Sequence, residues 1–286
     1  MYYGLLGLAG KVSAPSFTGL LDTYTGAAVA YSAARRLSTA YTGALIRVRR
    51  SSDNTEQDIG YNGSNVLDET ALTTFVGAGN GFVTKWYDQS GNAKNLENST
   101  ALNQPRIVTS GTVLKDNSKP ALSFNGTSQY LAVTDNTILH ASSLTSCFYT
   151  AQIISGNSNS PLASKSYNGD GGYFFGQLGT DNKIQLYIDQ GLNIVGTAAI
   201  LNSQKLFTNF NQTGTNNIKY YINGSLDAQD TKASLSGTNS TYFALGFDPG
   251  GFYLKGNFQE AIIYSTDKTS DKTGIESNIN TFYTIY

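Results

Sequence analysis

The stretch Phe82–Asn92 reads FVTKWYDQSGN, and it is the segment that decides the fold class of this chain. Its first part, Phe82–Tyr87, is rich in aromatic and β-branched side chains, which predicts a strand. The polar residues that follow predict a turn, because Asp88 can accept a hydrogen bond from a nearby backbone N–H and Gly91 can adopt a positive φ. A strand that runs into such a turn is typical of antiparallel sheets.

Short strand-like segments separated by turns continue to the C-terminus. The clearest is Ile218–Ile222, because the Asn223-Gly224 pair directly after it is the signature of a tight hairpin turn. Aromatic residues make up 12% of the chain and favour pleated sheet. Many short strands at this spacing predict an all-β, jelly-roll β-sandwich. The other expected strands are 44–50, 121–124, 130–133, 147–154, 173–175, 184–188, 206–210, 243–247 and 258–264.

Two or three short helices are expected around the sandwich. Residues 27–41 are rich in Ala, carry apolar residues at helical spacing and are followed by Gly43, so they predict the first helix. Asp68 is the expected N-cap of a second helix that ends at Gly77. Ser270 is the expected N-cap of a C-terminal helix. The apolar face of that last helix should consist of Ile275, Ile279 and Phe282.

The 286 residues are expected to form an N-terminal arm, residues 1–20, and one domain, residues 21–286. The arm has Gly and Pro among small apolar residues and no strand alternation, so we expect it to dock on another surface. It lacks the positively charged start of a secretory signal. No stretch is apolar enough for a membrane helix, which predicts that the membrane is not a partner.

Charge and cysteine content exclude several functions. Charged residues are 14% of the chain and the net charge is −1, so there is no basic field for nucleic acid. Cys147 and His140 are each the single residue of their type, which rules out an intrachain disulfide and a Cys/His zinc site. We therefore expect no metal and no cofactor.

Residues 28–97 resemble the N-terminal part of the catalytic domain of fungal α-L-arabinofuranosidase B. The segments that carry the resemblance are Ala30–Arg35, Thr42–Leu45, Arg50–Asp53 and Tyr87–Asn92, and the last of these is the most specific. Residues 120–286 are similar to the laminin-G and concanavalin-like superfamily. The resemblance implies a concanavalin-like jelly roll.

The same resemblance locates the positions where catalytic groups are expected. A retaining glycosidase of this family needs a nucleophile and an acid/base carboxyl about 5–5.5 Å apart. Gln190 stands where the resemblance places the nucleophile, and an amide cannot form the glycosyl ester. Asp248 lies near the acid/base position, one or two residues away from it. The weak carboxyl candidates are therefore Asp189, Asp248 and Glu260.

Because of Gln190, the sequence favours a non-enzymatic protein. Chains with these motifs are similar to virion proteins of tailed bacteriophages, so the main expectation is a structural or surface protein of the particle, such as a decoration, fibre or adhesin. Its expected partners are other virion proteins bound through the arm, further copies of itself in a homo-oligomer, and a cell-surface glycan. The alternatives are an α-L-arabinofuranosidase and a secreted or surface lectin-like carbohydrate-binding module.

Sugar binding would need an aromatic platform with polar side chains beside it. Five aromatic residues lie in or near Gly-rich loops and are the candidates for such a platform. They are Tyr167, Tyr173, Phe174, Phe252 and Tyr253.

Overall fold

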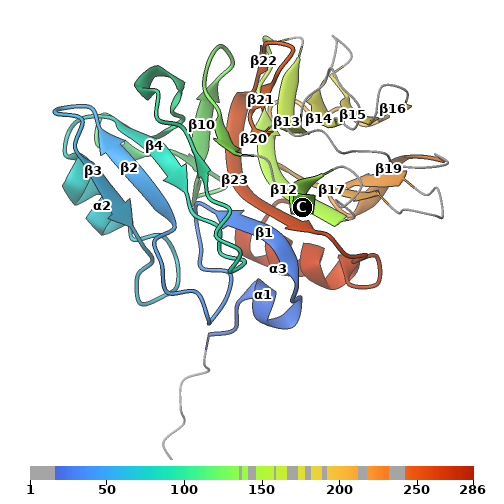
Figure 1. Ribbon diagram of the computed structural model, residues 1–286, viewed down its shortest axis with the longest axis horizontal. Coiled ribbons are helices and arrows are strands. Elements are labelled where there is room, and N and C mark those ends of the chain that lie inside the picture. The colour runs from blue at the N-terminus through green and yellow to red at the C-terminus, as the bar shows by residue number, and fades with distance from the viewer. Residues whose placement is uncertain are drawn as a thin grey trace, which may run out of the picture.

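Two antiparallel β-sheets packed face to face form the body of the molecule (Figure 1). The computed structural model describes residues 17–134, 137–140, 146–157, 159–165, 173–177, 182–188, 192–211, 218–231 and 242–286. Nearly all regular structure in these ranges is β, which confirms the expected jelly-roll β-sandwich. The predicted arm lies almost wholly outside the described residues.

The first sheet consists of ten strands that pair in one continuous series. Its strand order differs from the chain order, because strands from the first third of the chain pair through β5 and β11 with strands from the second half. In spatial order the strands are β3 (Glu56–Ile59), β2 (Ile46–Arg50), β4 (Gly81–Trp86), β5 (Leu96–Glu97), β11 (Leu131–Val133), β20 (Phe243–Leu245), β13 (Ser160–Lys165), β14 (Tyr173–Gln177), β15 (Ile184–Ile188) and β16 (Leu192–Val195).

The second sheet is built around β23 (Lys255–Tyr264), which runs through the middle of the molecule (Figure 1). One edge of β23 pairs with β1 (Ala27–Ser32) and then with β10 (Leu122–Asn125). The other edge pairs with β12 (Ser146–Ile153). The series continues through β17 (Lys205–Asn211), β18 (Ile218–Ile222) and β19 (Ser225–Asp230).

Short strands connect the two sheets and close their loops. β6 (Arg106–Thr109) pairs with both β10 and β4, so it joins the second sheet to the first, and β7 (Thr112–Val113) extends it. Two separate hairpins are β8 (Lys115–Asp116) with β9 (Lys119–Pro120) and β21 (Phe247–Asp248) with β22 (Phe252–Tyr253). Two 3₁₀ turns cover Ala101–Asn103 and Thr137–Leu139.

Buried side chains divide into two apolar clusters. The larger lies between the sheets and is centred on aromatic residues such as Trp86, Tyr149 and Phe258. The smaller lies between the second sheet and two helices, α1 (Leu20–Thr23) and α3 (Lys272–Tyr283), which sit together in Figure 1. The helices cover the outer face of the second sheet. The outer face of the first sheet is therefore where a functional site can lie.

The helix predictions have mixed outcomes. The second helix is confirmed as α2 (Glu69–Val76), since Asp68 accepts a hydrogen bond from the Ala71 N–H and Gly77 follows the helix. The C-terminal helix is also confirmed, although Asp271 rather than Ser270 occupies the N-cap position. Its residues Ile275 and Ile279 are buried as expected.

The prediction of an Ala-rich helix at 27–41 is wrong, because the first part of this segment is the fully buried strand β1. Helix propensity describes only the local preference of a segment. Here hydrogen-bonding partners on both edges of β1 override that preference. One partner is β23, and the other is the turn at 87–92. Asp88 accepts a hydrogen bond from the Ala30 N–H at 2.9 Å, and the Gln89 N–H donates to the Ala30 carbonyl at 2.7 Å.

Candidate functional site

A row of nine side chains crosses the outer face of the first sheet. Residues that pair directly in antiparallel strands project from the same face. Their neighbours along each strand, such as Val48, Trp86 and Leu245, belong to the core, so the row faces away from it. Two anions and two cations begin the row, small residues follow, and aromatic residues end it. From β3 to β15 it reads Asp58, Arg47, Lys85, Glu97, Ala132, Ala244, Ser164, Phe174 and Tyr187.

A cleft of about 590 Å³ lies over the charged half of this row. Its lining includes the charged residues Arg47, Lys85 and Glu97 and the aromatic residues Tyr130 and Tyr242. The small side chain of Ala132, which follows Glu97 in the row, also lines the cleft, so the cleft combines charged and aromatic groups. Hydroxyl-rich ligands such as sugars suit this combination, because aromatic rings cover their C–H faces and charged groups bind their hydroxyls.

Ion pairs hold the charged end of the cleft. Lys85 Nζ lies 2.9 Å from a Glu97 carboxylate oxygen, and Arg47 Nε donates to Asp58 at 2.8 Å. The Tyr87 hydroxyl also donates to Asp58 at 2.7 Å, and burial together with this bond raises the pKa of Tyr87 to about 12. Tyr87, the first residue of the YDQSGN motif, therefore helps to fix the position of Asp58 at the end of the row.

Asp248 is a buried carboxyl that the β21–β22 hairpin carries across the outer face of the sheet. Gly246 adopts a φ of +82°, which turns the chain after β20. The hydroxyl of Ser164, a member of the row, donates to the Phe247 carbonyl at 2.5 Å and ties the hairpin to β13. Asp248 Oδ1 accepts from the Gly250 N–H at 2.8 Å. Its Oδ2 has no partner among the described residues.

Burial raises the pKa of Asp248 to about 6. The Asp248 charge in turn contributes to the raised pKa of Tyr242, which burial brings to about 12, so this carboxyl lies near the Tyr242 wall of the cleft. A carboxylic acid that keeps its proton in mildly acidic solution can act as a general acid. This environment differs from that of an ordinary turn-capping Asp.

Four aromatic rings pack together where the β21–β22 hairpin meets the cleft. Phe247 stacks 5.9 Å from Tyr242 and lies 4.8 Å from Tyr130, measured between ring centroids. Tyr253 packs on the same ring at 4.9 Å. We call Tyr130, Tyr242, Phe247 and Tyr253 the aromatic wall. Because it combines side chains from two separate parts of the chain, residue 130 and residues 242–253, its position depends on the pairing of β11 with β20.

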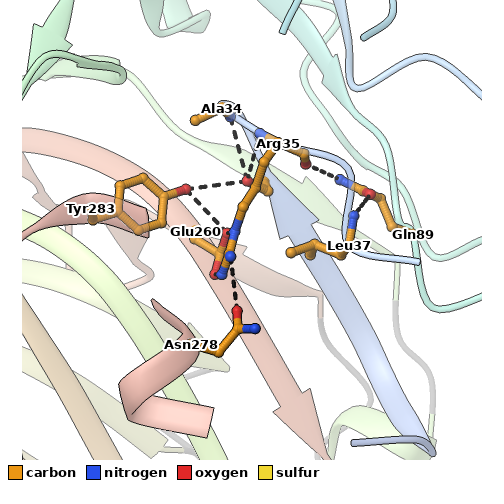
Figure 2. Close-up of polar contacts among 8 residues, drawn as sticks. Ala34, Arg35, Leu37, Gln89, Glu260, Asn278 and Tyr283 are labelled. Carbon is orange, nitrogen blue, oxygen red and sulfur yellow. Dashed lines mark hydrogen bonds and ion pairs between the residues drawn. The ribbon is translucent and has the colours of Figure 1, made fainter. Parts of the chain in front are cut away.

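Of the predicted carboxyl candidates, only Asp248 is placed near the cleft. Asp189 and also Gln190 lie outside the described residues. Glu260 is on the second sheet and faces α3, where Arg35 binds both of its carboxylate oxygens at 2.7 and 2.8 Å. Figure 2 shows that the Tyr283 hydroxyl also points at Glu260 and that Asn278 accepts from Arg35. Glu260 is therefore a structural anion and takes no part in the cleft.

The YDQSGN motif supports this buried network from the other side. The Gln89 amide accepts from the Leu37 N–H at 2.8 Å and donates to the Arg35 carbonyl at 3.1 Å (Figure 2). Asp88 accepts from the Ser90 N–H, and Gly91 has a φ of +94°, which confirms the predicted turn. The motif thus holds the backbone around Arg35.

The predicted aromatic platform does not form as one surface. Tyr173 and Phe174 are buried in the sheet, 5% and 0% exposed, and cannot present a free ring. Tyr167 lies outside the described residues. Phe252 and Tyr253 are half-buried on the hairpin beside Asp248.

Sequence reasoning assigned none of the residues that line the cleft to a site, including Glu56, Glu97, Tyr130 and Tyr242. Glu56 and Asp58 are two residues apart and therefore lie on one face of β3, and Lys85 precedes the buried Trp86 in β4, but only strand pairing shows that these polar faces adjoin. Among the described residues no group of three or more His, Cys, Asp or Glu side chains could hold a metal ion, and no helix there is long and apolar enough to cross a membrane.

Comparison with protein families matches residues 22–184 to the model described as α-L-arabinofuranosidase B, catalytic. Comparison with curated proteins gives no match. Among solved structures, an arabinofuranosidase complexed with arabinofuranosyl-α-1,2-xylobiose aligns over 88% of this chain and 62% of its own, with 17% identity and a TM-score of 0.67. A GH54 α-L-arabinofuranosidase soaked with a cyclic sulfate inhibitor aligns over 91% and 64%, with 17% identity and a TM-score of 0.68.

A sialidase of Trypanosoma rangeli is a more distant neighbour, with 13% identity, a TM-score of 0.50 and coverage of 67% of this chain and 30% of its own. These identities express likeness of fold, and the chain spans less than two thirds of the length of the two arabinofuranosidases. The match to a catalytic domain contradicts the expectation of a non-enzymatic virion protein. That expectation rested on Gln190, on the offset of Asp248 from the acid/base position and on the similarity of the motifs to virion proteins, and it gave too little weight to the resemblance of residues 28–97 to a catalytic domain.

Proposed function

Because the chain belongs to the family of α-L-arabinofuranosidase B catalytic domains, we propose that it is a glycoside hydrolase that releases arabinofuranosyl units. The observation that carries the proposal is Asp248, a buried carboxyl with a raised pKa beside an aromatic wall and a polar cleft. A glycosidase uses such a group to protonate the oxygen of the leaving group. Burial and the free Oδ2 suit Asp248 to this role.

A retaining mechanism needs a second carboxyl, which attacks the anomeric carbon and forms a glycosyl ester that water later hydrolyses. We assign this role to Asp189, which directly follows β15 in the chain and adjoins Gln190. The assignment gives different roles to the neighbouring residues Asp189 and Gln190. If Asp189 is the nucleophile, an amide at position 190 is no obstacle to catalysis.

Hydrolysis of 4-nitrophenyl α-L-arabinofuranoside tests the proposal. The wild type should release 4-nitrophenol, and Asp189→Asn should abolish release. Asp248→Asn should lower kcat/KM by about 100- to 10,000-fold on a sugar leaving group and by much less on 4-nitrophenol, which leaves without protonation. Asp53→Asn is the matched control, because Asp53 is an exposed carboxylate paired with Arg50 on the far side of β2.

Two results would contradict the assignments. Full activity in Asp189→Asn together with a gain in Gln190→Glu would place the nucleophile at position 190. A wild type that binds arabinofuranosides and never cleaves them at any pH between about 4 and 7 would leave a lectin-like module as the better reading.

A further inference from the structure

A cavity of about 140 Å³ lies between the segment that leads into α1 and the C-terminal helix α3. We call this cavity the entry pocket. Arg35 and Arg36 line it together with the polar residues Ser64, Asn65 and Asn278, and it shares no lining residue with the cleft. Its volume corresponds to four or five water molecules at about 30 Å³ each, which is enough for a carboxylate group or a sulfate ion.

The guanidinium of Arg36 is held in one position by its neighbours. Its Cζ lies 4.7 Å from the ring centroid of Tyr61 and 5.4 Å from that of Phe17. Its Nη1 donates to Asn65 Oδ1 at 3.2 Å, and its Nη2 donates to the Thr39 carbonyl. Its Nε is buried and has no partner among the described residues. Because a guanidinium has five N–H donors, Arg36 can still donate to a further acceptor.

The surroundings of the entry pocket carry more positive than negative charge. Glu260 neutralises Arg35, since one of its carboxylate oxygens lies 2.7 Å from the guanidinium. Within the described part of the chain, neither Arg36 nor Lys119 is paired with a carboxylate. Lys119 Nζ lies 4.3 Å from the ring centroid of Phe282, which also lines the pocket. The two unpaired cations favour an anionic ligand.

The segments beside the pocket do not supply a carboxylate to Arg36. Asp22 follows the lining residues Gly19 and Leu20, but its oxygens accept from the Gly19 N–H at 2.7 Å and from the Thr39 N–H at 3.0 Å. Residues 1–16, which precede the lining residue Phe17, contain no Asp or Glu. An anion for Arg36 would therefore come from another molecule.

We propose that the entry pocket is a binding site for one small oxyanion, which is either a free ion such as sulfate or the carboxylate of an acidic side chain of a partner protein. Arg36 supplies the charge and the N–H donors, and Ser64, Asn65 and Asn278 supply polar side chains. Because the lining includes both the segment before α1 and α3, the bound anion would hold these two parts of the chain together. The inference is independent of the proposed glycosidase function, since the pocket and the cleft have no residue in common.

Thermal unfolding of the full chain measures binding without any turnover, because a ligand that binds only the folded state raises the unfolding midpoint. Sodium sulfate and N-acetylaspartic acid α-amide are each titrated at constant ionic strength, with sodium chloride as the balancing salt. Each should raise the midpoint of the wild type in a saturating manner, by about 3 °C at a concentration ten times its Kd. Tighter binding of the aspartyl carboxylate would identify the ligand as an acidic side chain of a partner, and tighter binding of sulfate would identify it as a free ion.

Sulfate also stabilises proteins in general, because it is excluded from their surfaces, so the decisive comparison is between the wild type and variants. Arg36→Met should keep this general effect and lose the saturating rise with both ligands. Ser64→Asp places a carboxylate in the lining, so it should lose the saturating rise and have a higher midpoint than the wild type without ligand. This opposite change distinguishes an occupied pocket from a damaged one.

Arg50→Met is the matched control, because Arg50 is paired with Asp53 and does not line the pocket. It should respond to both ligands as the wild type does. Equal responses of the wild type and Arg36→Met, or a wild type without a saturating rise at concentrations up to about 100 mM, would overturn the site.

Discussion

Asp248→Asn should stabilise the protein at high pH and not at low pH. The folded state raises the pKa of this carboxyl from 3.8 to about 6, since burial disfavours its charged form. Between these values the folded state binds more protons than the unfolded state, so the free energy of unfolding falls as pH rises. The full cost at pH 8 is about 3 kcal/mol, and only a small part of it is already present at pH 4.

An amide at position 248 cannot ionise, so the free energy of unfolding of the variant does not fall in this way as pH rises. It can still accept from the Gly250 N–H, while its buried NH₂ group adds an unpaired donor worth about 1–3 kcal/mol. That penalty is the same at both pH values and cancels in the comparison. The stability difference between variant and wild type should therefore move by about 2 kcal/mol in favour of the variant between pH 4 and pH 8.

Urea denaturation of both proteins at the two pH values measures this shift. Asp53→Asn is the opposite control, because the Arg50 guanidinium holds the pKa of Asp53 well below its usual range and the wild-type charge is favourable there. Parallel behaviour of wild type and Asp248→Asn, within about 0.5 kcal/mol, would show that Asp248 is not a desolvated carboxyl. The general-acid assignment would lose its physical basis.

Three further substitutions test the scaffold, each by denaturant unfolding. Arg35→Met should cost about 3–5 kcal/mol because it leaves Glu260 buried without a cation, and adding Glu260→Gln should recover part of the loss; a single-variant cost below about 1 kcal/mol would contradict the buried pair. Gln89→Ala should cost about 2–3 kcal/mol, since a buried backbone N–H and carbonyl lose their amide partner; wild-type stability would mean that water replaces it. Gly256→Ala should cost more than about 2 kcal/mol because its Cβ would overlap a carbonyl oxygen of β12, whereas Gly60→Ala, with open space around it, should be nearly neutral; equal effects would refute the close approach.

Local patterns in the sequence predicted most of the sheet elements and two of the three helices. The segment Ile218–Ile222 with its Asn-Gly turn is a strand followed by a tight turn, and Asp68 caps a helix as expected. The failure at residues 27–41 has a physical cause. Ala is a good helix former, but the backbone of β1 has hydrogen-bonding partners on both edges, β23 on one and the turn at 87–92 on the other.

The cleft could not be predicted in the same way, because its residues meet only through non-local pairing. Lys85 and Glu97 adjoin through β4 and β5, and Ala132 and Ala244 adjoin through β11 and β20. The register that brings the polar faces together is set by strand pairing, and β11 and β20 are more than a hundred residues apart in the chain. Asp248 was found from resemblance, and its raised pKa follows from a burial that no local pattern reveals.

The buried carboxyls of Glu260 and Asp248 differ in their hydrogen-bond partners, and this difference distinguishes a structural residue from a candidate site residue. Glu260 receives two bonds from Arg35 and one from the Tyr283 hydroxyl, so its charge is compensated on every side and the fold depends on keeping it. Asp248 receives one backbone N–H on Oδ1, and its Oδ2 is left without a described partner. A fold gains nothing from the second arrangement, because an uncompensated buried carboxyl lowers stability whenever it ionises. Under the proposed function this cost is accounted for by use of the proton, because Asp248 adjoins the aromatic wall of the cleft.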